Sequence, residues 1–114
     1  MTSPTQRSLS LLRERGYTVA VVEHWNAFAR IRQDLFGFGD LLAIRTGEIL
    51  LVQTTTAANM AARRAKIAAE PRSALWILAG GKIEIHGWAK RKPRGQKVAK
   101  WEAKIERMED AVDV

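Results

Sequence analysis

The chain of 114 residues contains no cysteine, which excludes a disulfide framework and a metal site built from thiolates. No apolar run approaches the roughly 18 residues that a membrane span requires. Residues 1–7 also lack the apolar core of a signal peptide. We therefore expect one cytoplasmic domain, residues 1–114, with a single hydrophobic core.

Acidic residues are scarce relative to basic ones, with 12 Asp and Glu against 19 Lys and Arg, and the formal net charge is +7. Residues 1–62 carry six positive and five negative charges, whereas residues 63–114 carry thirteen and seven. The second half thus contributes +6 of the +7. Such an excess suits a protein that attracts a polyanion, so nucleic acid is the expected partner. The alternative is a basic surface that only confers solubility.

The first half of the chain alternates between helix and strand signals. Ser3-Pro4 predicts a helix start, and Gly16, which follows the apolar stripe, predicts the end of the same helix. The β-branched residues 17–22 predict a buried strand. Asp40 then enters an apolar strand that a Thr-Gly turn joins to a second strand, residues 48–56, and the pair predicts a hairpin.

The second half continues the same pattern. The alanine-rich residues 57–70 predict a helix that ends at Pro71. Residues 73–79 predict a buried strand, and residues 82–88 predict an antiparallel edge strand with one wet face. Residues 90–97 form a basic loop, and the spacing of apolar residues predicts a C-terminal helix over 98–108.

The hairpin carries the polar residues that point to chemistry. The two-residue period of a strand puts Gln53 and Thr55 on one face, which can meet Asp40. Gly37 and Gly39 permit a bulge or a close backbone approach just before Asp40.

These residues resemble the core of the PD-(D/E)XK, or restriction-endonuclease-like, nuclease superfamily, in particular its compact resolvase-like and phage-associated members. The resemblance covers roughly residues 8–88. It places Asp40 at the motif Asp, Gln53 at the Asp/Glu and Thr55 at the Lys, a variant D...Q-x-T motif. It implies an α/β fold with a mixed sheet flanked by helices, in the order α-β-β-β-α-β-β-α.

The function implied by the resemblance is metal-dependent endonuclease cleavage of DNA, in the manner of a Holliday-junction resolvase, by a hydrolase that binds Mg²⁺ or Mn²⁺. The metal ligands would be Asp40, the side-chain oxygen of Gln53 and the backbone carbonyl of Thr54, with Asp34 or a substrate phosphate completing the shell. Branched DNA is a candidate substrate, and a homodimer is expected because small members of the superfamily often pair to cut two strands.

Thr55 cannot supply the charge of the motif lysine. By the resemblance, Arg63 or Lys66 on the following helix could replace it, since some members of the superfamily carry the catalytic lysine there. The alternative for this helix face is a grip on phosphate. The alternative for the whole protein is a catalytically inactive DNA-binding module on a nuclease fold, which Thr55 favours. A basic RNA-binding protein without nuclease ancestry would leave the placement of Asp34, Asp40 and Gln53 unexplained.

Two further groups of residues could contact nucleic acid. Trp25 and Phe28 could stack on a base or cover the core, and covering the core is the default expectation. Arg32 could clamp phosphate or pair with Asp34. The residues expected to bind DNA phosphates are all cationic: Arg30, Arg32, Arg63, Lys66, Lys90, Arg91, Lys92, Arg94 and Lys97.

Overall fold

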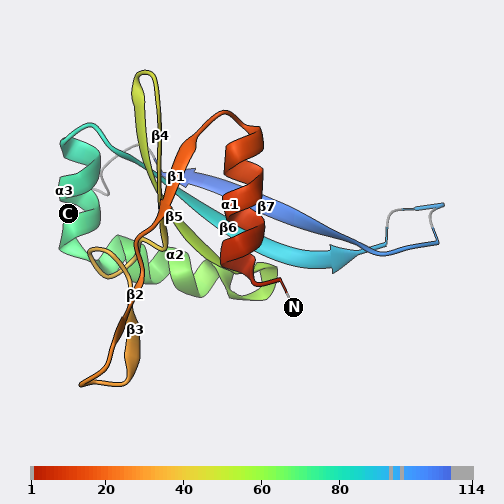
Figure 1. The fold of residues 1–114 in the computed structure, drawn as a ribbon, viewed down its shortest axis with the longest axis horizontal. Helices are drawn as coiled ribbons and strands as arrows, with labels where there is room; N and C mark the ends of the chain where they lie inside the picture. The colour runs from red at the N-terminus through yellow and green to blue at the C-terminus, as the bar shows by residue number, and fades with distance from the viewer. Residues whose placement is uncertain (1, 93, 96, 109–114) are drawn as a thin grey trace.

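Five strands form one mixed sheet at the centre of the molecule (Figure 1). The computed structural model describes residues 2–92, 94–95 and 97–108. Strands β5 and β6 are parallel, and every other neighbouring pair in the sheet is antiparallel. The strand order is β1 (Thr18–Val21), β4 (Leu41–Arg45), β5 (Glu48–Thr56), β6 (Lys82–Arg91) and β7 (Lys100–Met108). A separate two-stranded hairpin pairs β2 (His24–Asn26) with β3 (Ile31–Gln33).

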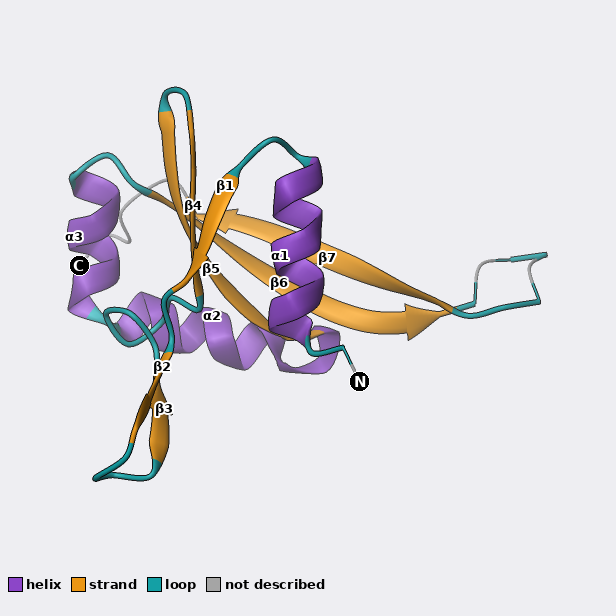
Figure 2. Ribbon diagram, in the orientation of Figure 1, coloured by secondary structure: helices purple, strands orange, loops and turns teal. Residues whose placement is uncertain are grey.

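Helices cover both faces of the sheet, which confirms the expected α/β class with a mixed sheet flanked by helices (Figure 2). On one face, α1 (Pro4–Glu14) packs Leu12 against apolar side chains of β4 and β5. On the other face, the 3-10 turn η1 (Ala57–Asn59) leads into α2 (Met60–Ala69), and α3 (Pro71–Leu78) follows. None of the helices described here combines the length and apolar character needed to cross a membrane.

The core divides into two layers because strand side chains alternate between the faces of the sheet. Along β5, Leu50 and Val52 lie in the cluster under α1, whereas Leu51 lies in the cluster under α2. The predicted hairpin, the N-terminal helix and the helix after the hairpin are all confirmed. Ser3 caps α1 as predicted, since its hydroxyl accepts a hydrogen bond from the Gln6 N–H at 3.2 Å.

The strand predicted over residues 73–79 is wrong: this segment belongs to helix α3. Pro71 occupies its first turn, and the Glu70 carboxylate caps it by accepting from the Arg72 N–H at 3.1 Å. Ser73 adds a second restraint by donating from its hydroxyl to the Ile67 carbonyl at 2.7 Å. Capping and a proline at the helix start therefore outweigh the β-like apolar run.

The C-terminal helix predicted over residues 98–108 is also wrong: Lys100–Met108 forms strand β7, antiparallel to β6. Trp101 and Ile105 suit both a helical stripe and strand alternation, and pairing with β6 selects the strand. The predicted basic loop is shorter than residues 90–97, because Lys90 and Arg91 continue β6. Pro93 and Gln96 of that loop lie outside the described residues.

Two predictions about exposure are reversed. The strand in residues 17–22 is an edge strand, and its Val21 is half exposed, so it is not buried. The strand in residues 82–88 is internal, between β5 and β7, and the side predicted to be wet is covered. Glu84, His86 and Trp88 on that side are all buried on the α1 face. The alternating polar side chains of β6 thus form a buried polar layer and not a solvent-exposed face.

The centre of this polar layer is the Glu84 carboxylate, which is 1% exposed. Arg15, at the end of α1, donates to it from both terminal nitrogens at 2.8 and 3.0 Å. Arg107 of β7 donates to it at 2.6 and 3.1 Å. Burial alone would raise the pKa of Glu84, but the hydrogen bonds from His86, Arg15 and Arg107 outweigh burial and hold this pKa below its ordinary value. Glu84 therefore ties α1 and β7 to the middle of the sheet.

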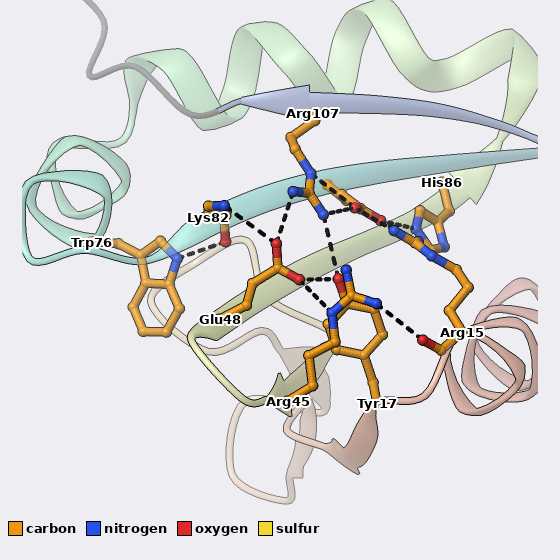
Figure 3. Close-up of polar contacts among 9 residues, drawn as sticks. Arg15, Tyr17, Arg45, Glu48, Trp76, Lys82, His86 and Arg107 are labelled. Atoms are coloured by element: carbon orange, nitrogen blue, oxygen red, sulfur yellow. Dashed lines mark hydrogen bonds and ion pairs between the residues drawn. The ribbon is translucent and has the colours of Figure 1, made fainter.

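A second carboxylate, Glu48, extends the layer at the start of β5 (Figure 3). It accepts hydrogen bonds from Tyr17, from Arg107 at 2.8 Å and from Lys82 at 3.3 Å, and Arg45 donates to it at 3.1 Å. The Tyr17 hydroxyl, followed by Arg107, lowers the pKa of Glu48 from 4.5 to about 2 despite partial desolvation. The folded state is therefore stabilised by the ionised form of Glu48.

We expect Glu48→Gln to lower the melting temperature at neutral pH, because hydrogen bonds to a charged group contribute about 1.5–3 kcal/mol. A depressed pKa stabilises the fold above the unfolded-state value of 4.5 and loses that contribution as the pH falls towards about 2. Thermal unfolding of wild type and variant, followed by circular dichroism from pH 7 to pH 2, should show a difference that closes on acidification. Glu102→Gln, an exposed position on β7, is the control. A difference that stays constant over this range would contradict the prediction.

Candidate metal and nucleic-acid site

A tight turn delivers Asp40 to the start of β4. The Gly39 N–H donates to the Leu35 carbonyl at 2.9 Å, and Phe38 between them is fully buried. A Cβ at Gly39 would lie 2.8 Å from the Leu51 side chain, so any larger residue at this position would have to displace the buried Leu51. The turn therefore explains the glycines that precede Asp40.

Asp40 is 4% exposed and is held by the neighbouring strand. Its Oδ2 accepts from the Gln53 amide at 2.8 Å, from the Thr54 N–H at 2.8 Å and from the Thr54 hydroxyl at 3.1 Å. The Thr54 hydroxyl also contacts the Thr5 hydroxyl of α1 at 2.9 Å. The structure thus brings together Asp40, Gln53 and Thr54, as expected from the hairpin, and places the first turn of α1 beside them.

Two more carboxylates converge on Asp40. Oxygens of Glu23, Asp34 and Asp40 all lie within 4.8 Å of one another. Asp34 was expected here, whereas Glu23 was not. The sequence signal for Glu23 is its position directly after the strand predicted over residues 17–22. In the structure β1 is antiparallel to β4, and the Val22 N–H donates to the Asp40 carbonyl at 2.9 Å, so the end of β1 lies next to Asp40.

The pKa of Asp40 is raised to about 8. Burial is the main cause, and the adjoining carboxyl of Asp34 adds to it, while the Thr54 N–H acts in the opposite direction. Glu23 contributes a smaller repulsion. Three acids this close therefore favour a proton or a cation among them.

The Gln53 side chain adds a neutral oxygen. Its amide nitrogen donates to Asp40 and, at 3.3 Å, to the Thr54 carbonyl. Its Oε1 is buried and has no hydrogen-bond partner among the described residues. A buried oxygen without a donor is costly unless a ligand contacts it. Carboxylate and amide oxygens are the ligands that Mg²⁺ and related hard cations take, so this group of residues fits such an ion.

The acids lie in a cavity of about 640 Å³ that cationic side chains also line. Arg32 pairs with Glu23 at 3.5 Å, in place of the expected alternative pair with Asp34. Lys66 of α2 lies 4.0 Å from Asp34. Arg63 lines the same cavity from the preceding turn of α2. Thr55 does not line it: this residue is buried opposite Gly87 of β6.

The remaining predicted cations lie away from the cavity. Arg30 is exposed at the tip of the β2–β3 hairpin. The others are exposed at the far end of the β6–β7 ladder, which extends beyond the helices (Figure 1): Lys90, Arg91, Lys92, Arg94 and Lys97.

A second polar cluster, Ser8, His86 and Glu84, resembles a hydrolytic triad only in composition. His86 Nδ1 lies 2.9 Å from the Ser8 hydroxyl, and His86 Nε2 lies 2.8 Å from Glu84. The Ser8 hydroxyl also accepts from the Trp88 indole at 2.9 Å. Ser8 and His86 are fully buried and cannot meet a substrate. These residues therefore attach α1 to the sheet.

No family model matches the chain, and comparisons with curated proteins and with solved structures gave no significant match.

We expect the protein to bind Mn²⁺, used as a probe for a hard divalent cation, and Asp40→Asn to weaken this binding at least about tenfold. Loss of even an outer-shell partner usually costs that much, and Asp40 lies at the centre of the acids. Isothermal titration calorimetry would measure the affinities, with Glu102→Gln as a control for loss of one exposed carboxylate. Equal affinity in wild type and Asp40→Asn would remove this cluster as the metal site.

Proposed function

We propose that the protein is a metal-dependent DNA endonuclease of the PD-(D/E)XK type. The observation that carries the proposal is the convergence of Glu23, Asp34 and Asp40 in one cation-rimmed cavity. Gln53 also lines this cavity, and its buried Oε1 has no hydrogen-bond partner among the described residues. The hairpin that holds Asp40 and Gln53 in a mixed sheet between two layers of helices agrees with the resemblance of the sequence to that superfamily.

The donors suit Mg²⁺ or Mn²⁺. Glu23, Asp34 and Asp40 would hold the ion, and Gln53 Oε1 would replace the second motif acid with a neutral ligand. When bound, the ion supplies a water of lowered pKa and positive charge beside the phosphate. The Thr54 N–H and hydroxyl fix the orientation of the Asp40 carboxylate from outside this group.

Lys66 is the best placed replacement for the motif lysine. It extends from α2 into the cavity, and its Nζ lies 4.0 Å from Asp34. A cation there offsets charge on the phosphate that undergoes attack, as the motif lysine does from the strand in the superfamily. Arg63 and Arg32 line the same cavity and suit bidentate contacts with phosphate oxygens on either side.

The rest of the basic surface suits a polyanion. The β6–β7 end adds exposed Lys90, Arg91 and Lys92, and no acidic residue interrupts residues 85–101. The N-terminal turn of α1 lines the cavity as well, and the N-terminus of a helix favours phosphate. DNA that lies across the cavity therefore meets positive charge from several elements.

We expect cleavage of labelled DNA to require Mg²⁺ or Mn²⁺ and to be lost in Asp40→Asn. Lys66→Ala should lower the rate by roughly 10²–10³-fold, the usual cost of one oriented charge-stabilising donor, and Lys66→Arg should recover part of it. Lys104→Ala, a lysine on β7 outside the cavity, is the control. Gel assays of linear, forked and four-way-junction DNA, with EDTA as the metal-free comparison, would measure the rates. Cleavage that persists in Asp40→Asn would contradict this site.

We expect DNA affinity to fall steeply with salt because much of the binding is contact with phosphates. Replacing Lys90, Arg91 and Lys92 together by alanine should reduce the slope of log K against log salt by up to about 2.7, at about 0.9 per phosphate contact. Fluorescence anisotropy from 50 to 300 mM salt, roughly the range over which such slopes are resolved, would measure it. Arg13→Ala, which removes an exposed positive charge from the last turn of α1, tests whether the loss of a positive charge elsewhere on the surface reduces the salt slope in the same way. An unchanged slope would exclude the β6–β7 end as a contact.

A second candidate, a DNA-binding module without hydrolysis, is supported by Thr55. Its side chain is buried against β6, outside the cavity, so the strand supplies no cation to the site. If Lys66 does not take that role, the same surface binds DNA without cutting it. Binding that persists without cleavage of any substrate, with either metal, would select this candidate.

A further inference from the structure

The β2–β3 hairpin, residues 24–33, projects from the body of the protein (Figure 2). Its large apolar side chains are exposed. Phe28 at its tip is fully exposed, and Trp25 is 59% exposed. The default expectation that these aromatic rings cover the core is therefore wrong. Exposed aromatic rings on a projecting element are typical of a binding surface.

The tip of the hairpin is an ordered turn. The Asn26 side chain accepts hydrogen bonds from the Phe28 N–H at 3.0 Å and from the Ala29 N–H at 3.1 Å. Arg30 closes the turn with a φ of 54°, a left-handed conformation that is unfavourable for a residue with a Cβ. The backbone thus holds Phe28 outward at some conformational cost.

The hairpin is attached directly to the candidate site. Glu23 precedes it and Asp34 follows it, so two of the three clustered acids lie at its base. Trp25 is paired with Arg32 across the hairpin, and directly opposed residues extend from the same face of a sheet. Arg32 lines the cavity, so the face of the hairpin that carries Arg32 and the Trp25 ring is the one next to the cavity. A strand bound at the acids would run beside this ring.

The charge of the hairpin favours nucleic acid over an apolar protein partner. Arg30 and Arg32 accompany the aromatic rings, and residues 24–33 contain no acidic residue. Aromatic rings stack on bases, and arginine binds phosphate and also stacks. In an intact duplex the base faces are stacked on each other, and reaching them requires the strand to open.

We propose that the β2–β3 hairpin is a base-stacking element that directs the site to DNA with unpaired bases, such as forks and junctions, over intact duplex. Trp25 stacks on an unpaired base next to the bound phosphate, and Phe28 extends the contact along the same strand or into the branch point. This inference rests on the proposed nuclease function and specifies its substrate class.

The test compares binding of a fluorescein-labelled forked DNA with binding of a fully paired duplex of the same length, by anisotropy in EDTA. Trp25→Ala and Phe28→Ala should each weaken binding of the fork about 5- to 150-fold, the effect of losing one stacked base, and should change duplex binding less than about twofold. Trp25→Phe should retain most of the fork affinity. Leu78→Ala, which removes from α3 an apolar side chain that is 75% exposed, should change neither. Circular dichroism checks that each variant is folded.

Several outcomes would overturn the proposal. Unchanged fork affinity in both alanine variants excludes stacking, and an equal loss on fork and duplex makes the hairpin a general phosphate contact. Dissociation of a wild-type dimer by Trp25→Ala, seen by light scattering without a change in fork binding, assigns the hairpin to a second copy of the chain.

Cleavage in Mg²⁺ separates this inference from the proposed function. If wild type cuts duplex as fast as fork and the hairpin variants leave that ratio unchanged, the nuclease stands and the stacking element fails. If no DNA is cut but fork binding depends on Trp25 as expected, the stacking element stands and the nuclease fails.

Discussion

The buried carboxyl of Asp40 is the point on which the arrangement of the site depends. Its side chain binds Gln53 and Thr54 of β5, and its backbone carbonyl accepts from Val22 at the end of β1. Thr54 in turn contacts Thr5, so the start of α1 is fixed to the same point. Burial and the neighbouring acids both disfavour the charged form of Asp40, which is why its pKa rises to about 8. The repulsion among these acids lowers the stability of the folded state, and a cation bound among them would relieve that repulsion, as expected of a binding site.

The Glu84 layer stabilises the α1 face of the sheet by the opposite means. Glu84 has two arginines and a histidine around it, so its charge is balanced within the protein and its pKa falls. At Asp40, by contrast, the surrounding donors are neutral and its nearest charged neighbours are acids. The Asp40 cluster lines a cavity, whereas Glu84 is enclosed by the surrounding protein and is 1% exposed. Charge balance therefore distinguishes the structural acid from the candidate ligands.

The sequence predicts those features that depend on short-range pattern. The hairpin, its alternation and the approach of Asp40 to Gln53 follow from residues that are close along the chain. Features that depend on tertiary pairing are missed. The apolar pattern of residues 98–108 is compatible with both a helix and a strand, and pairing with β6 selects the strand. The alternation around Glu84 predicts an exposed side chain, but α1 covers it in the structure. Glu23 is missed for the same reason, because it is the pairing of β1 with β4 that brings the end of β1 close to Asp40.

The position of Thr55 gives a physical reason why the proposed replacement for the motif lysine, Lys66, lies on α2 and not on the strand. Thr55 is buried and lies opposite Gly87. The Met60 side chain fills the space next to Gly87, because a Cβ added at Gly87 would lie only 2.2 Å from Met60 Sδ. A lysine at position 55 would have to displace this packing, at a cost of about 1–3 kcal/mol for overpacking. Lys66 reaches the cavity from the exposed side of α2 without that cost. The close packing of η1 and α2 on β6 therefore supports the proposed role of Lys66 over a cation at position 55.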